Sequence, residues 1–222
     1  MAEPSSENDT APKRRRDPER TREAILEVAA KLLASDGREG LSVSKVAQSA
    51  GINRGTAYHH FQTREQLLIA TVEWVSEKLC NEVFGPKQED GQRSIQLEPH
   101  ELINNLANFV MESPDLGRVW LAKMLRTSQP ERDLFWCEYK AHIARFVRAD
   151  LAEPDIDEEV HGVLMLVGAI LWPVWTRSGS RSVAERKKNT KRYINEVVRH
   201  SLHGVLRNEK FPSLKPGADS DT

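Results

Sequence analysis

The chain has 222 residues, of which 39% are hydrophobic and 29% charged. These values are typical of a soluble globular protein with one or two domains, and they exclude a largely disordered chain. The net charge is only -1, but residues 11–65 hold 11 Lys and Arg against 7 Asp and Glu. A basic end on an acidic body favours a polyanionic partner, although a solvated basic tail would have the same composition.

The cysteines and the apolar segments indicate a cytoplasmic protein. Cys80 and Cys137 lie far apart and lack the spacing of a metal site, so we expect free thiols in a reducing compartment. No secretory apolar segment follows Met1. The longest apolar run, 162–175, contains Pro173 and is shorter than the ~18 residues of a membrane span. We therefore expect no membrane partner.

The first 16 residues are polar and end in a basic cluster at 13–16, so we predict a disordered basic arm. A helix should begin directly after it. Asp17 can cap this helix, Pro18 suits its first position, and Glu19 places an acid in its first turn. Apolar residues then recur at spacings of three and four until Gly37, which predicts one buried face.

Two short helices should follow. Ser42 can cap the first, which should end at Gly51. Asn53 can cap the second, which continues into the two histidines at 59 and 60. A long fourth helix is predicted from Thr63, because the sequence from Thr63 to Gln66 fits a capping box.

The remaining sequence predicts further helices and no strand, since no segment alternates apolar and polar residues. Residues 85–96 should form a loop, and Pro99, Pro114 and Pro130 each suit a helix start, with Ser113 as a cap. Apolar periodicity predicts helices at about 160–174 and 183–206. The predicted fold is all-α, with about nine helices. Its parts are an arm at 1–16, a three-helix domain at 17–65, a larger helical domain at 66–210 and a flexible tail at 211–222, and the long helix joins the two domains.

The two short helices joined at Gly51 predict a helix-turn-helix, whose second helix enters the major groove of DNA. Arg54, Tyr58 and His59 should point outward from it. An arginine can contact guanine through two hydrogen bonds, and a tyrosine or histidine can contact a base or a phosphate. Gly55 would let the backbone approach the DNA closely.

The segment from Thr21 to Leu68 resembles the N-terminal domain of the TetR family of regulators. The residues that carry the resemblance are Ala24-Ile25-Leu26, Gly40-Leu41-Ser42, Val46-Ala47, Ala50-Gly51-Ile52, Gly55-Thr56-Ala57-Tyr58, Phe61, Arg64-Glu65 and Leu67-Leu68. His60 departs from the pattern, because a tyrosine is commoner at this position.

The resemblance implies a set of DNA-contacting residues and assigns most of them a role. Phosphate contacts are expected from the second helix, at Ser42, Ser44 and Lys45, and from His60, Thr63 and Arg64. Arg54, Gly55, Tyr58 and His59 would face the major groove, and Asn53 and Thr56 are further DNA-binding candidates. Residues 17–65 would then be the helix-turn-helix DNA-binding domain and residues 66–210 the ligand-binding and dimerisation domain. The basic cluster at 13–16 could reach the minor groove, although plain disorder would explain it too.

One recognition helix reads only a few base pairs, so a dimer on a palindromic operator is expected. The helix predicted at about 160–174 is apolar around most of its circumference, so it should be buried on more than one side. It and the last helix would pack against the same two helices of a second copy. The alternative is that it is a core helix of a monomer. The interface candidates are Leu164, Val167, Ile170, Leu171, Val197, Val198, Leu202 and Val205. Aromatic and thioether side chains could line a pocket for a small, mainly apolar effector, although they could equally be ordinary core residues. These candidates are Trp74, Phe109, Trp120, Met124, Trp136, Phe146 and Trp175.

Other functions find less support in the sequence. The chain lacks a phosphate-binding glycine loop and a GxSxG motif. His200 and His203 could hold zinc, but surface histidines are far commoner, so we predict neither an enzyme nor a metal or cofactor. A helical adaptor for protein partners is the alternative to a regulator. We expect a repressor that an effector releases, although an activator would have the same sequence features.

Overall fold

The structure is a computed structural model that describes residues 17–88, 93, 97, 99–148, 156–176 and 182–203. Over these ranges the chain forms nine α-helices and one turn of 3-10 helix, without a strand. The predicted all-α class is therefore confirmed. The chain divides into two compact units, Met1–Thr71 and Val72–Thr222, and α4 (Arg64–Phe84) begins in the first and ends in the second.

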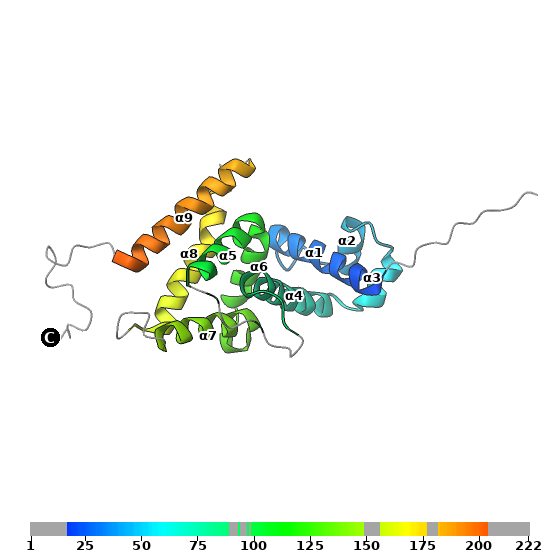
Figure 1. Ribbon diagram of the computed structural model, residues 1–222. Helices are drawn as coiled ribbons and strands as arrows, with labels where there is room; N and C mark the ends of the chain where they lie inside the picture. Colours follow the sequence, from blue (N-terminus) through cyan, green and yellow to red (C-terminus); the bar gives the residue numbers. More distant parts are fainter. Residues whose placement is uncertain are drawn as a thin grey trace, which may run out of the picture. The chain divides into compact units, whose positions relative to one another are not determined.

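The first unit contains α1 (Pro18–Asp36), α2 (Val43–Ser49), α3 (Arg54–His60) and the beginning of α4 (Figure 1). Helix α2 packs against both α1 and α3. The start of α1 follows the sequence prediction, because the backbone N–H of Glu19 donates to Asp17 Oδ1 at 3.0 Å. Gly51 lies between α2 and α3 with φ of +63°, a conformation that glycine adopts without strain. The side chains that fill this core include Ile25, Leu26, Ala29, Val46, Ala47, Ala57 and Phe61.

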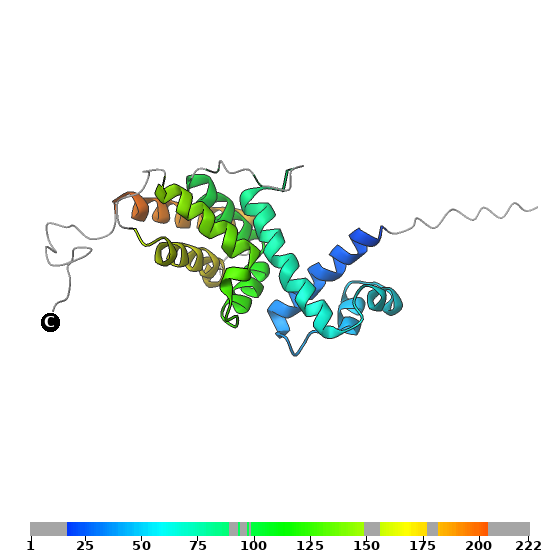
Figure 2. The same ribbon diagram turned by 90° about the horizontal axis from the view of Figure 1, so that it is seen from below.

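The second unit contains α5 (Pro99–Glu112), α6 (Pro114–Met124), η1 (Pro130–Arg132), α7 (Leu134–Arg148), α8 (Glu158–Thr176) and α9 (Val183–His203). Helix α8 contacts α5, α6, α7 and α9 (Figure 2 shows the same helices from a second side). The predicted caps differ in detail. Ser113 precedes α6 without a side-chain hydrogen bond, and Pro130 begins only a 3-10 turn. The last helix is described as far as His203, short of the predicted end at 206.

A buried carboxylate connects three helices of the second unit. Asp133 precedes α7 and is 3% exposed. Its Oδ1 accepts from the backbone N–H of Trp136 and from Nε1–H of Trp120, both at 2.9 Å. Its Oδ2 accepts from Ser76 Oγ and from Lys123 Nζ, both at 2.6 Å. Burial raises the pKa of the Asp133 carboxyl, but these hydrogen bonds outweigh burial and hold the pKa below its ordinary value.

Helix α8 is longer than its apolar run suggested. It begins at Glu158, continues past Pro173 and spans 19 residues, so by length and composition it could cross a membrane. The apolar run itself remains 162–175, and the helix is longer because it also includes residues 158–161 and Thr176. A single such helix is weak support for a membrane span, and 28% of its apolar window is buried within the protomer.

Candidate DNA-binding surface

The predicted recognition helix α3 presents a polar face to solvent. Ala57 is fully buried and Phe61 is 3% exposed, so these two side chains hold α3 on its unit. Arg54, Gly55, Thr56 and His59 are exposed, and Tyr58 is 45% exposed. The face that α3 turns away from the core is therefore the one for which the sequence predicted DNA contacts.

Three residues of the predicted set act as helix caps. Ser42 Oγ accepts from the backbone N–H of Lys45 at 3.1 Å, and Asn53 Oδ1 accepts from Gly55 N–H at 2.8 Å, as the sequence predicted. Thr63 Oγ1 accepts from Gln66 N–H at 3.1 Å. The capping box at Thr63 is only half formed, because the Gln66 side chain accepts from the N–H of Gln62 rather than of Thr63.

Two of the predicted phosphate contacts are engaged within the protein. Lys45 Nζ lies 2.5 Å from Asp36 Oδ2, and the hydrogen bond from Lys45 lowers the pKa of the Asp36 carboxyl. The guanidinium of Arg64 donates to the backbone carbonyl of Arg38. Both cations therefore brace the connection between α1 and α2, a role that their sequence positions did not reveal.

The α2 side of the recognition helix is fixed by a contact between two predicted DNA-binding residues. Ser44 Oγ and Tyr58 Oη lie 3.2 Å apart, and either hydroxyl can be the donor. The bond places the phenol of Tyr58 beside the N-terminal turn of α2. Hydroxyl groups from both helices are thus gathered on one edge of the exposed face.

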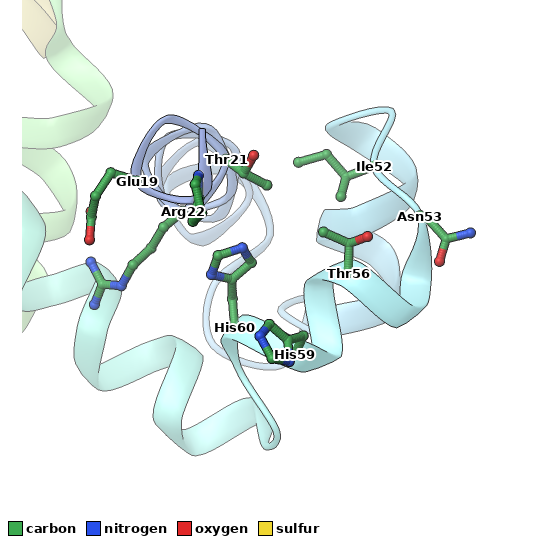
Figure 3. A pocket seen from close by; sticks show the side chains of 9 residues that line it. Glu19, Thr21, Arg22, Ile52, Asn53, Thr56, His59 and His60 are labelled. Atoms are coloured by element: carbon green, nitrogen blue, oxygen red, sulfur yellow. The ribbon is translucent and has the colours of Figure 1, made fainter. Parts of the chain in front are cut away.

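The opposite edge of α3 borders a hollow of about 600 Å³, which lies between α3 and the first turn of α1 (Figure 3). Among the described residues, the side chains of Arg54, Thr56, His59 and His60 form no hydrogen bond or ion pair, so their polar atoms are available to a ligand. The hollow is lined by Pro18, Glu19, Thr21, Arg22, Ile52, Asn53, Thr56, His59 and His60. Sequence analysis did not include the α1 residues, because it treated α1 only as support for the core.

The predicted effector-pocket residues lie in the second unit, in different environments. Phe109, Trp120 and Trp136 are buried. Trp74, Met124 and Phe146 are partly exposed. Trp175 is 82% exposed and is not part of the packed interior. The Trp120 ring meets Phe135 edge-on at 5.4 Å, so at least this candidate contributes to the core.

The predicted dimer residues divide between core and surface. Leu164, Leu171 and Leu202 are 64%, 48% and 70% exposed, and Val167, Val197 and Val198 are partly exposed. Ile170 is only 2% exposed and belongs to the core of the protomer, because its side chain packs against Gly117 of α6. Val205 and the basic cluster at 13–16 lie outside the described residues.

The described part of the chain holds no group of three or more side chains that could bind a metal ion. His200 and His203 are both exposed on the last turns of α9.

Comparisons with known proteins agree with this arrangement. The family described as "Bacterial regulatory proteins, tetR family" matches residues 25–71. The transcriptional regulator CymR of Pseudomonas putida is 38% identical over 110 residues, which are 46% of this chain and 51% of that protein. The transcriptional repressor AcnR of Corynebacterium glutamicum is 34% identical over 140 residues, or 61% of this chain and 66% of that protein. The chain thus spans about half of CymR and about two thirds of AcnR.

Solved structures show the same fold over most of the chain. A TetR family transcription regulator from Marinobacter aquaeolei VT8 superposes with a TM-score of 0.60 at 18% identity, covering 80% of this chain and 95% of that one. These relatives and neighbours are transcription regulators and not enzymes, as the sequence predicted. The helix-turn-helix of the first unit, the matched family and the shared fold lead to one conclusion: this chain is a transcription regulator that belongs to the TetR family.

Proposed function

We propose that the protein is a repressor that binds a palindromic DNA operator as a dimer and is released by a small, mainly apolar effector. The observation that carries the proposal is the exposed face of α3, where the polar side chains of Arg54 and His59 make no hydrogen bond or ion pair with another described residue. Polar side chains left without partners on a short helix suit the edges of base pairs in a major groove.

Each group on this surface has a role in the proposal. Arg54 would read a guanine and His59 a neighbouring base or phosphate. Gly55 has no side chain and would let the backbone approach the groove. The hydroxyls of Ser42 and Thr63 accept hydrogen bonds as caps, and each can still donate its own hydrogen to a phosphate.

The exposed apolar face of α8 supports a dimer. Val163, Leu164 and Leu171 are between 42% and 64% exposed, and Trp175 is 82% exposed. Water contact with so many large apolar side chains on one helix is unfavourable, and a second copy would remove it. Leu202 of α9 would extend the same interface, since α8 and α9 pack together. Two recognition helices related by a twofold axis would then read the two halves of a palindrome.

The effector would bind in the second unit, which holds the buried aromatic residues Phe109, Trp120 and Trp136. A ligand weakens operator binding only by the difference in its affinity for two conformations, typically ~1–3 kcal/mol. Helix α4 is continuous between the two units and is the element through which such a difference would act. The protein would work in the cytoplasm, where the operator and a small metabolite are both accessible.

Selection of duplexes from a random DNA pool by the purified full-length protein tests the proposal. We expect an enriched palindrome, bound with nanomolar affinity at physiological salt by a protein of dimeric mass. Enrichment of no sequence at this salt concentration would contradict a sequence-specific regulator. Thermal-shift screening of apolar metabolites, followed by competition with the selected duplex, then tests the release by an effector.

A further inference from the structure

The exposed surface of α3 divides into three stripes along the helix. Arg54 and Tyr58, four residues apart, share the stripe next to α2, where Tyr58 meets Ser44. Gly55 and His59, also four residues apart, form a second exposed stripe, and His59 reaches the border of the hollow. Asn53, Thr56 and His60, at spacings of three and four, face the hollow beside α1. The two edges of the recognition helix are therefore chemically distinct.

The geometry of a major groove gives each edge a phosphate strand to meet. The groove is ~12 Å wide and a helix with its side chains is ~10–12 Å across, so a helix inside it lies close to both walls. Those walls are the sugar-phosphate backbones of the two DNA strands. Ser44 of α2 lies beside Tyr58 on one side of α3, and its hydroxyl can meet one strand. The hollow lies on the other side (Figure 3).

The hollow contains the groups that a phosphate requires. Arg22 lines the hollow from α1. Its guanidinium carbon lies 5.4 Å from the centre of the Phe61 ring, and its side chain has no hydrogen bond or ion pair among the described residues. The Thr56 hydroxyl and the His60 imidazole are likewise without partners there. A guanidinium that lies over an aromatic ring keeps its N–H groups free to donate hydrogen bonds to an anion.

Two other residues of the first turn of α1 limit what the hollow can hold. Thr21 donates its hydroxyl to the backbone carbonyl of Asp17 at 3.0 Å and is not available as a donor. Glu19 brings a carboxylate to the hollow, which repels an anion. One strongly basic residue opposed by one acid suits a single phosphate better than a multiply charged ligand.

We propose that this hollow binds one backbone phosphate in each half-site, on the strand opposite to the one that α2 contacts. Arg22 supplies the positive charge, Thr56 and His60 supply hydrogen bonds, and Glu19 weakens the contact. The inference rests on the proposed DNA binding and adds the first turn of α1 to the interface. It fixes the recognition helix in the groove from both sides.

Charge-neutral variants of α1 test the inference on the duplex obtained by selection. Arg22→Gln is expected to weaken binding about tenfold on specific and random DNA alike and to lower the salt slope by about one, as for the loss of one charged phosphate contact. Arg20→Gln is the matched control, because Arg20 is exposed on α1 and does not line the hollow. Its loss should cost about twofold. Glu19→Gln is expected to tighten binding by about twofold to fivefold.

Methylphosphonate substitution locates the phosphate. Neutralising one phosphate at a time in the duplex should reveal a costly position on each strand of the half-site. Neutralising the phosphate on the strand away from α2 should no longer weaken binding by Arg22→Gln, whereas it should still weaken binding by Arg20→Gln. Equal effects of Arg22→Gln and Arg20→Gln, or costly phosphates on one strand only, would overturn the inference. If Arg22→Gln fails to fold by circular dichroism, the two-strand pattern in the wild type and the gain in Glu19→Gln decide it. A wild type that prefers no duplex would instead refute the proposed function.

Discussion

Replacement of Asp133 by alanine is expected to lower the free energy of unfolding by ~3 kcal/mol. This value is the sum over the four hydrogen bonds that the Asp133 carboxylate accepts. The loss falls mainly on the buried Nε1–H of Trp120, which has no other acceptor among the described residues and costs ~1–3 kcal/mol when unsatisfied. Loss of the cap on Trp136 N–H adds ~1 kcal/mol. Ser76 keeps the carbonyl of Val72 as an acceptor, and the side chain of Lys123 is 25% exposed and can reach water, so both contribute less.

The matched control is Asp157→Ala. Asp157 also caps a helix, since its Oδ1 accepts from Glu159 N–H at 3.0 Å and Val160 N–H at 2.9 Å, but it is exposed. Its loss should therefore cost only the ~1 kcal/mol of an ordinary cap. Urea unfolding of both variants at one protein concentration, followed by circular dichroism, measures the difference. Equal losses for the two variants would refute the claim that the buried hydrogen bonds of Asp133 stabilise the fold.

The difference in unfolding free energy between wild type and Asp133→Ala should depend on pH, and the pKa of Asp133 gives the direction of this dependence. The pKa of Asp133 is lower in the folded than in the unfolded chain, so its ionised form stabilises the fold above the unfolded value of about 3.9. This stabilisation is lost as the pH falls through the folded value. The difference in unfolding free energy between wild type and Asp133→Ala should be constant near neutral pH and shrink below about pH 4. A difference that grows on acidification would mean that the pKa of Asp133 is raised instead.

Three further predictions concern the DNA surface, the dimer and the thiols. Arg54→Ala should weaken specific binding by ~1–3 kcal/mol and relax the preference at one base position, whereas equal loss on random duplexes in a mobility-shift titration would reduce Arg54 to a general charge. Leu164→Asp places a charge on a side chain that is 64% exposed in the protomer, and light scattering at micromolar concentration should then give a monomeric mass; an unchanged dimer would move the interface elsewhere. Burial raises the pKa of the Cys80 thiol to about 12 and Cys137 is exposed, so a thiol reagent at pH 8 should modify one cysteine in the native protein and two after unfolding.

Local signals made the DNA-binding unit predictable. The caps at Asp17, Ser42 and Asn53 depend on hydrogen bonds that span two or three residues, and the structure contains all three. Gly51 marked the turn between α2 and α3 because few other residues adopt its positive φ. Interactions of such short range are determined by neighbouring residues, and sequence spacing reports them directly.

Features that depend on distant residues were not predictable in the same way. Asp133 reads as an ordinary polar residue after Pro130, and its partner Ser76 lies 57 residues away. Trp175 and Ile170 are both apolar and lie five residues apart, yet one is 82% and the other 2% exposed. Hydrophobic periodicity identifies an apolar helix but not which of its sides the rest of the protomer covers. On a helix as uniformly apolar as α8, this distinction requires the packed structure.

The residues of the candidate DNA surface differ in the contacts that they make within the free protein. These contacts affect how much each residue would contribute to the affinity for DNA. If Lys45 and Arg64 bind phosphate as proposed, Lys45 would lose its ion pair with Asp36 and Arg64 its hydrogen bond to the carbonyl of Arg38. Their contribution to affinity is a difference between two contacts, so each should count for less than its charge suggests. Arg22 and Arg54 have no hydrogen bond or ion pair to exchange among the described residues, and Arg22 can keep its contact with the Phe61 ring. A residue type and a family position cannot distinguish these cases, because an arginine that braces a turn and one that awaits a ligand are the same letter in the sequence.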